Sequence, residues 1–519
     1  MEKEQIWAEA RRHHEQGNLP AAAQLYGQLH QMDPNHPLPL HMLGVVAGQQ
    51  GMHQETAELM AKAAALGPDE PYLQADYANA LRNVGRNDEA MEILNALLAK
   101  DPDFVPALDY RGGLLWRLNR QEEALADYDR LLKHQLGRGD ILFRAGTILD
   151  QLGRAEEALA RYDRAVGIDP RNVEWRNSRG WARLQMGKFD AALSDFMQVT
   201  TSVPNYHGGQ LNLGFYRLLM GDFEKGLALY EARQYLPGQD FVRLFQEPLF
   251  TGAESLEGKT LLVHAEQGLG DTIQFCRFLP QLKKLGANIQ FLAQPQLKRL
   301  LESANLPVTF CDTVPAFDYH IPLMSVPLVL GVRLDSIPAP VPYLHAEPER
   351  VTAWAKRLGK DGLRVGIAWS GRDEAAARDK AFRLADLAPL AAIPGVRLIS
   401  LQKGESAKQL AGLPDGMKVE AFDDLDTDAA FVDTAAVMAN CDLVITADSA
   451  PAHLAGALGR PTWTLLRHVP DWRWHLNRAD SPWYPTMRLF RQRVRDEWDG
   501  VFAAMAAVLK ERIGAAFPQ

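Results

Sequence analysis

The chain has 519 residues, which is too long for one ordinary domain and long enough to bury more than one core. Hydrophobic residues make up 47% of it and charged residues 23%, values typical of a globular protein, and no apolar run is long enough for a membrane span. The charged N-terminal stretch has no apolar segment of the kind found in secretion signals, so we expect a cytoplasmic protein.

Cysteine usage and net charge exclude further classes of protein. Cys276, Cys311 and Cys441 lack CxxC spacing, so we expect neither a disulfide framework nor a zinc site. The formal net charge of -9 argues against a general nucleic-acid binder, because binding to phosphates needs clustered Lys and Arg. This net charge is compatible only with a local basic patch.

One position recurs every 34 residues in the first part of the chain: Gly17, Gly51, Gly85, Asn119, Gly153, Gly187 and Gly221. Five residues after each stands a small or compact residue, and four residues further on a bulky one, from Tyr26 in the first unit to Tyr230 in the last. This pattern resembles the tetratricopeptide (TPR) consensus, in which Gly or Asn takes a positive φ between two short helices. We predict an α-solenoid of seven TPR repeats over residues 1–235, followed by a connector over 236–258.

A TPR stack leaves a groove that receives an extended peptide or a partner helix, so the repeats predict a protein partner. Candidate groove residues on the first helices are Asn79, Asn83, Arg144, Asn177 and Asn212. The alternatives are a rigid spacer and a surface for a homodimer.

Short apolar runs alternate with amphipathic helices from Lys259 onward, a pattern typical of parallel sheets wound on both sides. The expected strands are TLLVHAE, NIQFLA, VTFC and YHIPLM in a first series, then LRVGIAWS, VRLISLQ, MKVEAF, DLVITA and PTWTLL. We predict two Rossmann-like α/β lobes, an acceptor-side lobe over 259–345 and a donor lobe over 346–495. A ligand cleft would lie between them, and the terminal helix in 496–519 would pack back on the acceptor lobe.

The segment ITADSAPAHLAGALGRPTWTLL, residues 445–466, places a small-residue helix directly after a strand, and the N-terminus of such a helix is a site for a diphosphate. It resembles the nucleotide-sugar segment of glycosyltransferase family 9, the heptosyltransferases, through Asp448, Ser449, His453, Leu454, Ala455, Gly459 and Pro461. Ala450 stands where that family usually has glycine. The alternative is a capped helix with a buried, satisfied His453.

The closer resemblance is to bacterial proteins that fuse TPR repeats to this GT-B type of transferase, and distantly to TPR-containing protein O-GlcNAc transferases. It is carried by EQGLGDTIQF at 266–275, GIAWSG at 366–371, LAPL at 387–390, SLQKG at 400–404 and PDWRWHLNRADSPWYPTMRLFRQ at 470–492. The resemblance implies an inverting glycosyltransferase that uses a nucleotide sugar.

The stretch HAEQGLGDT, residues 264–272, fails the dinucleotide fingerprint because no third small residue follows. Through the resemblance, Asp271 is the expected general base, with Glu266 and His264 as rivals, and the alternative is that Asp271 only caps the next helix. Gly268 and Gly270 would let the chain turn beside the substrates, and we count both among the donor-binding candidates.

The donor lobe needs positive charge for the leaving diphosphate, for which the candidates are Arg372, Lys380 and Arg383, with a solvated loop as the alternative. Gln402 and Lys403 would meet the base or ribose, beside Asp448, Ser449, Ala450 and His453. Trp369 and Trp472 are candidate cleft aromatics, although core packing is favoured for the Trp-rich block that contains Trp472. No convincing DxD pair stands at a strand end, and DDLD at 423–426 is interpreted as the approach to a helix, so we predict no metal.

These features predict an inverting, metal-independent glycosyltransferase that moves a sugar to a protein held by the repeats. The expected donor is a UDP- or GDP-sugar, with CMP-linked sugars also considered, and no cofactor is expected. The alternatives are a transferase for a glycan or lipid-linked acceptor and a non-catalytic TPR adaptor with a degenerate transferase lobe.

Overall fold

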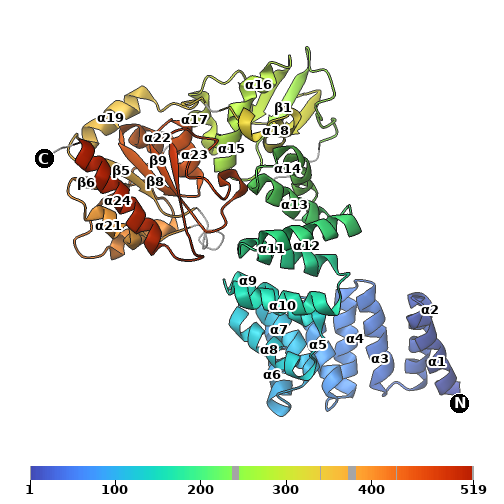
Figure 1. Cartoon of the computed structure of the whole chain (residues 1–519). Helices are drawn as coiled ribbons and strands as arrows, with labels where there is room; N and C mark the ends of the chain where they lie inside the picture. Colours follow the sequence, from blue (N-terminus) through green and yellow to red (C-terminus); the bar gives the residue numbers. More distant parts are fainter. Residues whose placement is uncertain (1, 237–244, 339, 372–380, 428, 517–519) are drawn as a thin grey trace. The chain divides into compact units, whose positions relative to one another are not determined.

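The computed structural model describes residues 2–236, 245–338, 340–371, 381–427 and 429–516. The chain divides into two compact units, Met1–Ala182 and Arg183–Gln519. We therefore describe each unit by itself (Figure 1). No helix in the described ranges is long and apolar enough to cross a membrane.

The first unit is built from helical hairpins. Its helices are α1 (Glu2–Glu15), α2 (Leu19–Met32), α3 (Pro37–Gln49), α4 (His53–Leu66), α5 (Pro71–Asn83), α6 (Asn87–Lys100), α7 (Val105–Arg117), α8 (Gln121–His134), α9 (Gly139–Gln151) and α10 (Ala155–Ile168). The next helix, α11 (Val173–Gln185), contains the boundary between the units. The second unit continues the series with α12 (Phe189–Ser202), α13 (His207–Leu219), α14 (Phe223–Tyr230) and the 3-10 helix η1 (Glu231–Tyr235).

The turn inside each hairpin confirms the repeat prediction. All seven of the recurrent Gly or Asn positions have a positive φ, from 59° at Asn119 to 87° at Gly221. Tyr26, Tyr128 and Phe196 are each 0% exposed, as expected for the bulky position of a repeat. The local sequence thus sets the hairpin geometry, and burial of the bulky residues holds each hairpin together.

Two parallel sheets follow in the second unit. The first has the order β3-β2-β1-β4 and consists of β1 (Thr260–His264), β2 (Asn288–Leu292), β3 (Thr309–Phe310) and β4 (Tyr319–Pro322). The second has the order β10-β9-β8-β5-β6-β7 and consists of β5 (Leu363–Ala368), β6 (Val396–Ser400), β7 (Val419–Glu420), β8 (Leu443–Ala447), β9 (Thr462–Leu466) and β10 (Met487–Arg491). All pairings within these sheets are parallel, which confirms the predicted α/β class.

The helices around the first sheet are short. They are α15 (Leu269–Phe275), the 3-10 helix η2 (Cys276–Phe278), α16 (Leu279–Lys283), α17 (Lys298–Glu302) and α18 (Val326–Val329), with 3-10 turns η3 (Pro295–Leu297), η4 (Leu323–Ser325) and η5 (Leu334–Ser336). Around the second sheet lie α19 (Pro348–Leu358), η6 (Leu384–Leu387), α21 (Ala388–Ala391), η7 (Glu405–Gly412), α22 (Val432–Asn440), α23 (Ala450–Ala457), η8 (Trp472–Trp474) and α24 (Asp499–Ala516). The helical stretch between Leu269 and Lys283 is interrupted by η2, and β10 was not among the expected strands.

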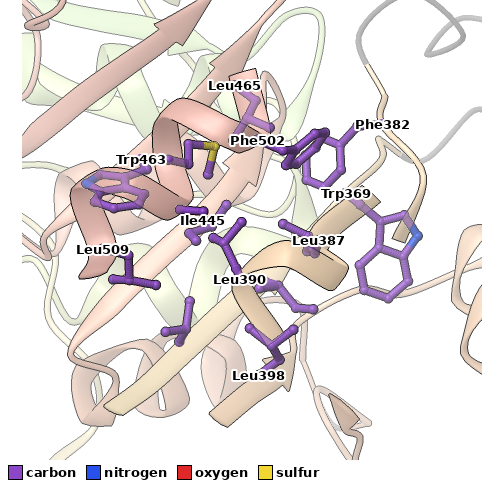
Figure 2. Close-up of a cluster of buried hydrophobic side chains, with 14 of the residues drawn as sticks. Trp369, Phe382, Leu387, Leu390, Leu398, Ile445, Trp463, Leu465, Phe502 and Leu509 are labelled. Carbon is purple, nitrogen blue, oxygen red and sulfur yellow. The ribbon is translucent and has the colours of Figure 1, made fainter. Parts of the chain in front are cut away.

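The terminal helix α24 corrects one prediction. We expected it to pack on the acceptor lobe, but Phe502 and Leu509 lie in the core of the second sheet with Ile445, Trp463 and Leu390 (Figure 2). The buried residues of α24, Val501, Phe502, Met505 and Leu509, recur at helical spacing, and the helix packs against η6 and α21 beside the second sheet. The helix therefore completes the donor lobe.

Candidate functional site

Ligands bind open parallel sheets beyond the carboxyl ends of the strands, where the strand order reverses. In the first sheet the reversal lies between β1 and β4, and in the second between β5 and β8. The sequence candidates from 264 to 272 follow β1, and Asp448 and Ser449 follow β8. Both predicted segments therefore start at a reversal point.

The reversal point of the first sheet is occupied by Glu266. This carboxylate is 3% exposed and accepts hydrogen bonds from Arg233 Nε at 3.0 Å, from Arg233 Nη2 at 2.7 Å and from the backbone N–H of Met324 at 3.1 Å. Burial lowers the pKa of Arg233, but Glu266 and Glu231 more than reverse this and raise it, so the guanidinium stays charged. Glu266 thus anchors the end of the repeat array, which leaves it poorly placed as the general base.

His264, the other rival base, is 2% exposed and lies with its Nε2 atom 3.4 Å from Nδ1 of His320. His264 is therefore a core residue behind the site. Of the three acidic or basic candidates in HAEQGLGDT, only Asp271 retains notable exposure, because 20% of its side chain is accessible.

Asp271 stands in the first turn of α15. Its Oδ2 atom accepts from the backbone N–H of Gly268 at 2.9 Å, so the capping interaction that we weighed as the alternative is present. Its Oδ1 atom accepts from Arg473 Nη2 at 2.6 Å. The capping bond fixes the carboxylate at the start of the helix, and the arginine links it to the other lobe.

Arg473 lies at the centre of this network. It also donates to Asp471 at 2.9 Å and to Gln274 Oε1 at 2.7 Å, and its guanidinium lies 4.6 Å from the ring centroid of Trp472. Burial lowers the pKa of Arg473, whereas Asp471 and Asp271 raise it further than burial lowers it. The arginine therefore stays charged and holds two carboxylates from different lobes in fixed positions.

The helix α23 faces this network from the donor lobe. Ser449 is its N-cap residue, and the Ser449 Oγ atom donates to the Ala447 carbonyl at 3.3 Å, so the first N–H groups of the helix are not capped by a side chain. His453 stacks on Trp474 at 5.4 Å and pairs with the Tyr484 hydroxyl at 3.0 Å. Burial lowers the pKa of His453 to about 3, so its imidazole is neutral at physiological pH.

Gly270 allows α15 and α23 to approach each other closely. A Cβ atom there would lie 3.0 Å from Cδ2 of His453 and 3.2 Å from Cα of Ala450. Glycine therefore lets α15 pack on α23 more closely than a residue with a Cβ atom would. Ala450, which departs from the family pattern, lies directly against this glycine.

Tyr230 enters the site from the last repeat, and sequence reasoning assigned it only to the repeat core. Its ring centroid lies 5.9 Å from that of Trp472. Burial raises the pKa of Tyr230, Arg473 lowers it, and Asp471 and Asp271 raise it, so the phenol stays protonated at neutral pH. The last repeat thus presents a neutral hydroxyl beside the charges of the site.

The predicted donor residues are placed as follows. Gln402 accepts from the backbone N–H groups of Trp369 and Ser370 at 3.0 Å each, and Lys403 donates to the Leu425 carbonyl. Arg383 is 81% exposed, pairs with Asp386 and lines a cavity of about 740 Å³. Arg372 and Lys380 lie outside the described residues. Contacts with a nucleotide stay predictions for all of these side chains.

Burial contradicts the prediction that Trp369 and Trp472 are aromatic residues of the cleft. Trp369 is 0% exposed and donates from Nε1 to the Ser406 carbonyl at 3.1 Å, and Trp472 is 1% exposed. Neither side chain offers a face to a ligand, because both are enclosed by neighbouring core residues. The packing role that we favoured for the Trp-rich block is therefore confirmed for Trp472.

The DDLD segment has the structural role that we expected. Asp426 accepts from the backbone N–H groups of Asp433 and Thr434 at 2.7 and 3.0 Å and so caps the start of α22. Within the described ranges, no group of three or more His, Cys, Asp or Glu side chains is arranged to hold a metal ion.

Comparison with known proteins agrees with both halves of this architecture. Residues 49–109 and 143–207 match models of the tetratricopeptide repeat, and residues 385–492 match the model of glycosyltransferase family 9 (heptosyltransferase). The chain is 28% identical over 314 residues to Protein FlbA of Caulobacter vibrioides, a match that covers 55% of this chain and 52% of FlbA. The chain thus spans about half the length of that curated relative, since 52% of FlbA is covered.

Similar solved structures are TPR proteins. One, from Parabacteroides merdae, is 20% identical, with 46% of this chain and 94% of that chain covered and a TM-score of 0.37. Another is YrrB, described as a TPR protein with an unusual peptide-binding site, which is 24% identical, with 36% and 96% covered and a TM-score of 0.32. By the family matches alone, the chain carries tetratricopeptide repeats together with a glycosyltransferase family 9 domain.

Proposed function

We propose that the protein is an inverting, metal-independent glycosyltransferase that moves a sugar from a nucleotide sugar to a protein acceptor held by the repeats. One observation carries the proposal: the partly exposed carboxylate of Asp271 is held by Arg473 of the donor lobe, next to the close contact of Gly270 with Ala450 and His453. The family 9 match over residues 385–492 supports the reaction class.

In this reaction Asp271 removes the proton of the acceptor hydroxyl. The oxygen then attacks the anomeric carbon from the face opposite the nucleotide, and the bond between that carbon and the phosphate oxygen breaks with its electrons on the phosphate. The anomeric configuration inverts because a single displacement takes place. Arg473 fixes the direction of the Asp271 carboxylate for this step.

The leaving diphosphate would lie at the N-terminus of α23. The backbone N–H groups after Ser449 and the positive end of the helix dipole stabilise the negative charge that develops there. His453 remains neutral behind them and supports the helix by stacking on Trp474. UDP- and GDP-sugars are the first donors to test, followed by CMP-linked sugars.

A protein acceptor is proposed from the repeats, which bind polypeptides in many proteins. The last repeat is joined to the transferase through Arg233 and Glu266 and presents Tyr230 beside the site. An acceptor segment bound at the last repeat would therefore lie on the same compact unit as the transferase lobes.

A thermal-shift panel of UDP, GDP, ADP, CMP and their sugars tests the donor site. A ligand at about 100 times its dissociation constant stabilises the folded protein by roughly 2.7 kcal/mol. We expect one nucleotide to raise the Tm of the full chain, and Ser449→Asp to abolish this shift because a carboxylate repels the diphosphate. Ser255→Asp, which changes an exposed serine elsewhere in the unit, should leave the shift intact.

A non-catalytic adaptor is the second candidate, and one observation favours it: both oxygens of Asp271 are already bound, one to Gly268 and one to Arg473. If no nucleotide or nucleotide sugar shifts the Tm, the adaptor is the better interpretation. A nucleotide shift together with transfer to a glycan but to no protein would instead indicate a glycan or lipid-linked acceptor.

A further inference from the structure

A buried arginine lies where the two α/β lobes meet. Arg277 of η2 is 5% exposed, and its Nη1 atom donates to the Trp483 carbonyl at 2.6 Å and to the Pro338 carbonyl at 3.1 Å. Its Nε atom donates to the Gln274 carbonyl at 3.0 Å, near the end of α15. In the part of the chain that the structure describes, no carboxylate is among its partners. The cation is therefore held by the negative end of a helix and by carbonyl groups from both lobes.

Two tyrosine rings enclose the Arg277 guanidinium. Its Cζ atom lies 4.5 Å from the ring centroid of Tyr343 and 4.6 Å from that of Tyr484. The Nη2 atom donates to the Tyr343 hydroxyl at 2.9 Å, and this hydroxyl donates to the Ile273 carbonyl at 2.9 Å. Burial lowers the pKa of Arg277, whereas Tyr343 and Tyr484 raise it, with a net increase, so the guanidinium stays charged. A cation is attracted to the face of an aromatic ring, so Arg277 fixes the positions of both tyrosines.

Tyr484 contacts α23 at two places. Its hydroxyl lies 3.0 Å from Nδ1 of His453, and a Cβ atom at Gly456 would lie 2.4 Å from Cδ1 of its ring. Burial raises the pKa of Tyr484 well above its usual value, so the hydroxyl keeps a proton to donate. The Tyr343 oxygen already accepts from Arg277, which makes the imidazole lone pair the better acceptor for that proton. A neutral imidazole that accepts at Nδ1 carries its own proton on Nε2.

The opposite edge of the His453 ring lies at the start of α23. A helical side chain leans toward the N-terminus of its helix, so His453 leans toward Ala450, the first residue of α23. A Cβ atom at Gly270 would lie 3.0 Å from Cδ2 of His453, the carbon bonded to Nε2, and 3.2 Å from Cα of Ala450. The histidine is 6% exposed, and its Nε2 atom forms no hydrogen bond with any residue that the structure describes. A nearly buried N–H without an acceptor costs free energy, so this atom points to a ligand at the start of the helix.

We propose that Arg277 and Tyr484 are positioning residues that hold His453 as the tautomer with its proton on Nε2, so that this N–H donates to a phosphate oxygen of the nucleotide. The nature of the ligand rests on the proposed function, whereas the tautomer does not. The imidazole adds one donor to the backbone N–H groups of the first turn of α23, where the leaving diphosphate is proposed to lie. Because the ring is neutral, it stabilises negative charge by donating a hydrogen bond without giving up its proton.

Nitrogen NMR of the full chain labelled with ¹⁵N-histidine measures the tautomer, and His453→Phe assigns the signal. We expect the wild type at neutral pH to have a protonated Nε2 and an unprotonated Nδ1. Tyr484→Phe removes only the hydroxyl group, so we expect a mixture of both tautomers in this variant. Arg277→Lys keeps the charge but lacks the planar guanidinium, and it should give an intermediate mixture. A wild-type proton on Nδ1 would overturn the proposal.

Binding of inorganic pyrophosphate, and of the nucleotide identified by thermal shift, tests the ligand. We expect Tyr484→Phe to raise both Kd values about three- to tenfold, because the His453 donor is no longer held in one tautomer. The matched control is Tyr216→Phe. Tyr216 of α13 is also buried in the second unit and its ring contacts Phe196, so this variant should change either Kd less than about twofold.

A double-mutant cycle separates positioning from a general structural role. If Tyr484 acts through His453, Tyr484→Phe should not change the Kd further in a His453→Phe background. Additive effects of the two substitutions, or equal effects of Tyr484→Phe and Tyr216→Phe, would overturn the proposal. A chain that binds pyrophosphate in this way but no nucleotide would keep the histidine site and contradict the proposed transferase. Nucleotide binding that is insensitive to Tyr484→Phe and His453→Phe would leave the transferase standing and contradict the histidine site.

Discussion

Asp271 and Asp471 come from different lobes and bind the same guanidinium. Arg473 donates to Asp271 at 2.6 Å and to Asp471 at 2.9 Å. If the two carboxylates only neutralised Arg473, replacing either of them would have nearly the same effect. A catalytic role distinguishes them, because only a general base must lose function when its charge is removed.

At this scale we expect Asp271→Asn to lower kcat by about 100-fold or more, with little change in donor affinity, because an amide cannot accept the acceptor proton. Asp471→Asn is the matched control, since it also leaves Arg473 with one carboxylate. Steady-state kinetics with the donor identified by thermal shift measure both. Equal losses in the two variants would show that pairing of Arg473, and not proton transfer, explains the effect.

At the scale of elements, the site depends on the contact of α15 with α23. Both helices start directly after a strand, and each is too short to be stable alone. Their packing is close because Gly270 has no side chain where His453 and Ala450 approach. The glycine of HAEQGLGDT thus sets the separation between the two segments that carry the candidate site.

We therefore expect Gly270→Ala to lower the free energy of unfolding of the second unit by about 1 to 3 kcal/mol and to weaken nucleotide binding, because the methyl group meets backbone atoms of α23. Gly500→Ala is the control: a Cβ atom there has nothing within 4 Å, and helical glycine is replaced by alanine at no cost. Denaturant titrations of both variants give the comparison. Unchanged stability of Gly270→Ala would mean that the helices separate freely.

At the scale of the whole molecule, the second compact unit contains both repeat helices and transferase lobes. Phe223 of α14 lies 6.0 Å from Trp472, and His475 Nδ1 lies 3.2 Å from the Leu219 carbonyl. Together with Arg233 and Glu266, these contacts make the last repeat part of the transferase core. A boundary drawn where the repeats end in sequence would cut through this core.

The fragment 183–519 should therefore fold and bind nucleotide as the full chain does, whereas 246–519 should unfold at a lower temperature and bind hydrophobic dyes. Loss of Arg233 leaves Glu266 as an unpaired buried carboxylate, which costs about 3 to 5 kcal/mol. Loss of Phe223 and Tyr230 uncovers Trp472. Thermal unfolding and dye fluorescence measure the difference. If 246–519 unfolded at the same temperature as 183–519, the last repeat would be dispensable for the fold.

The sequence by itself determined the elements whose physics is local. Repeats with a positive-φ residue every 34 positions, apolar strands and the Ser449 helix start all depend on neighbours within one turn or one hairpin.

Tertiary structure alone decided the roles of side chains within the site. Glu266 and Asp271 look alike in sequence, yet one pairs with Arg233 in the core and the other stays partly exposed beside Arg473. Asp271 and Arg473 are separated by 202 positions, and no local pattern reports such a pair. The same holds for α24, whose buried residues pack into the core of the second sheet, against α21 and η6. Periodicity encodes which face of an element is buried, but only long-range packing determines what buries it.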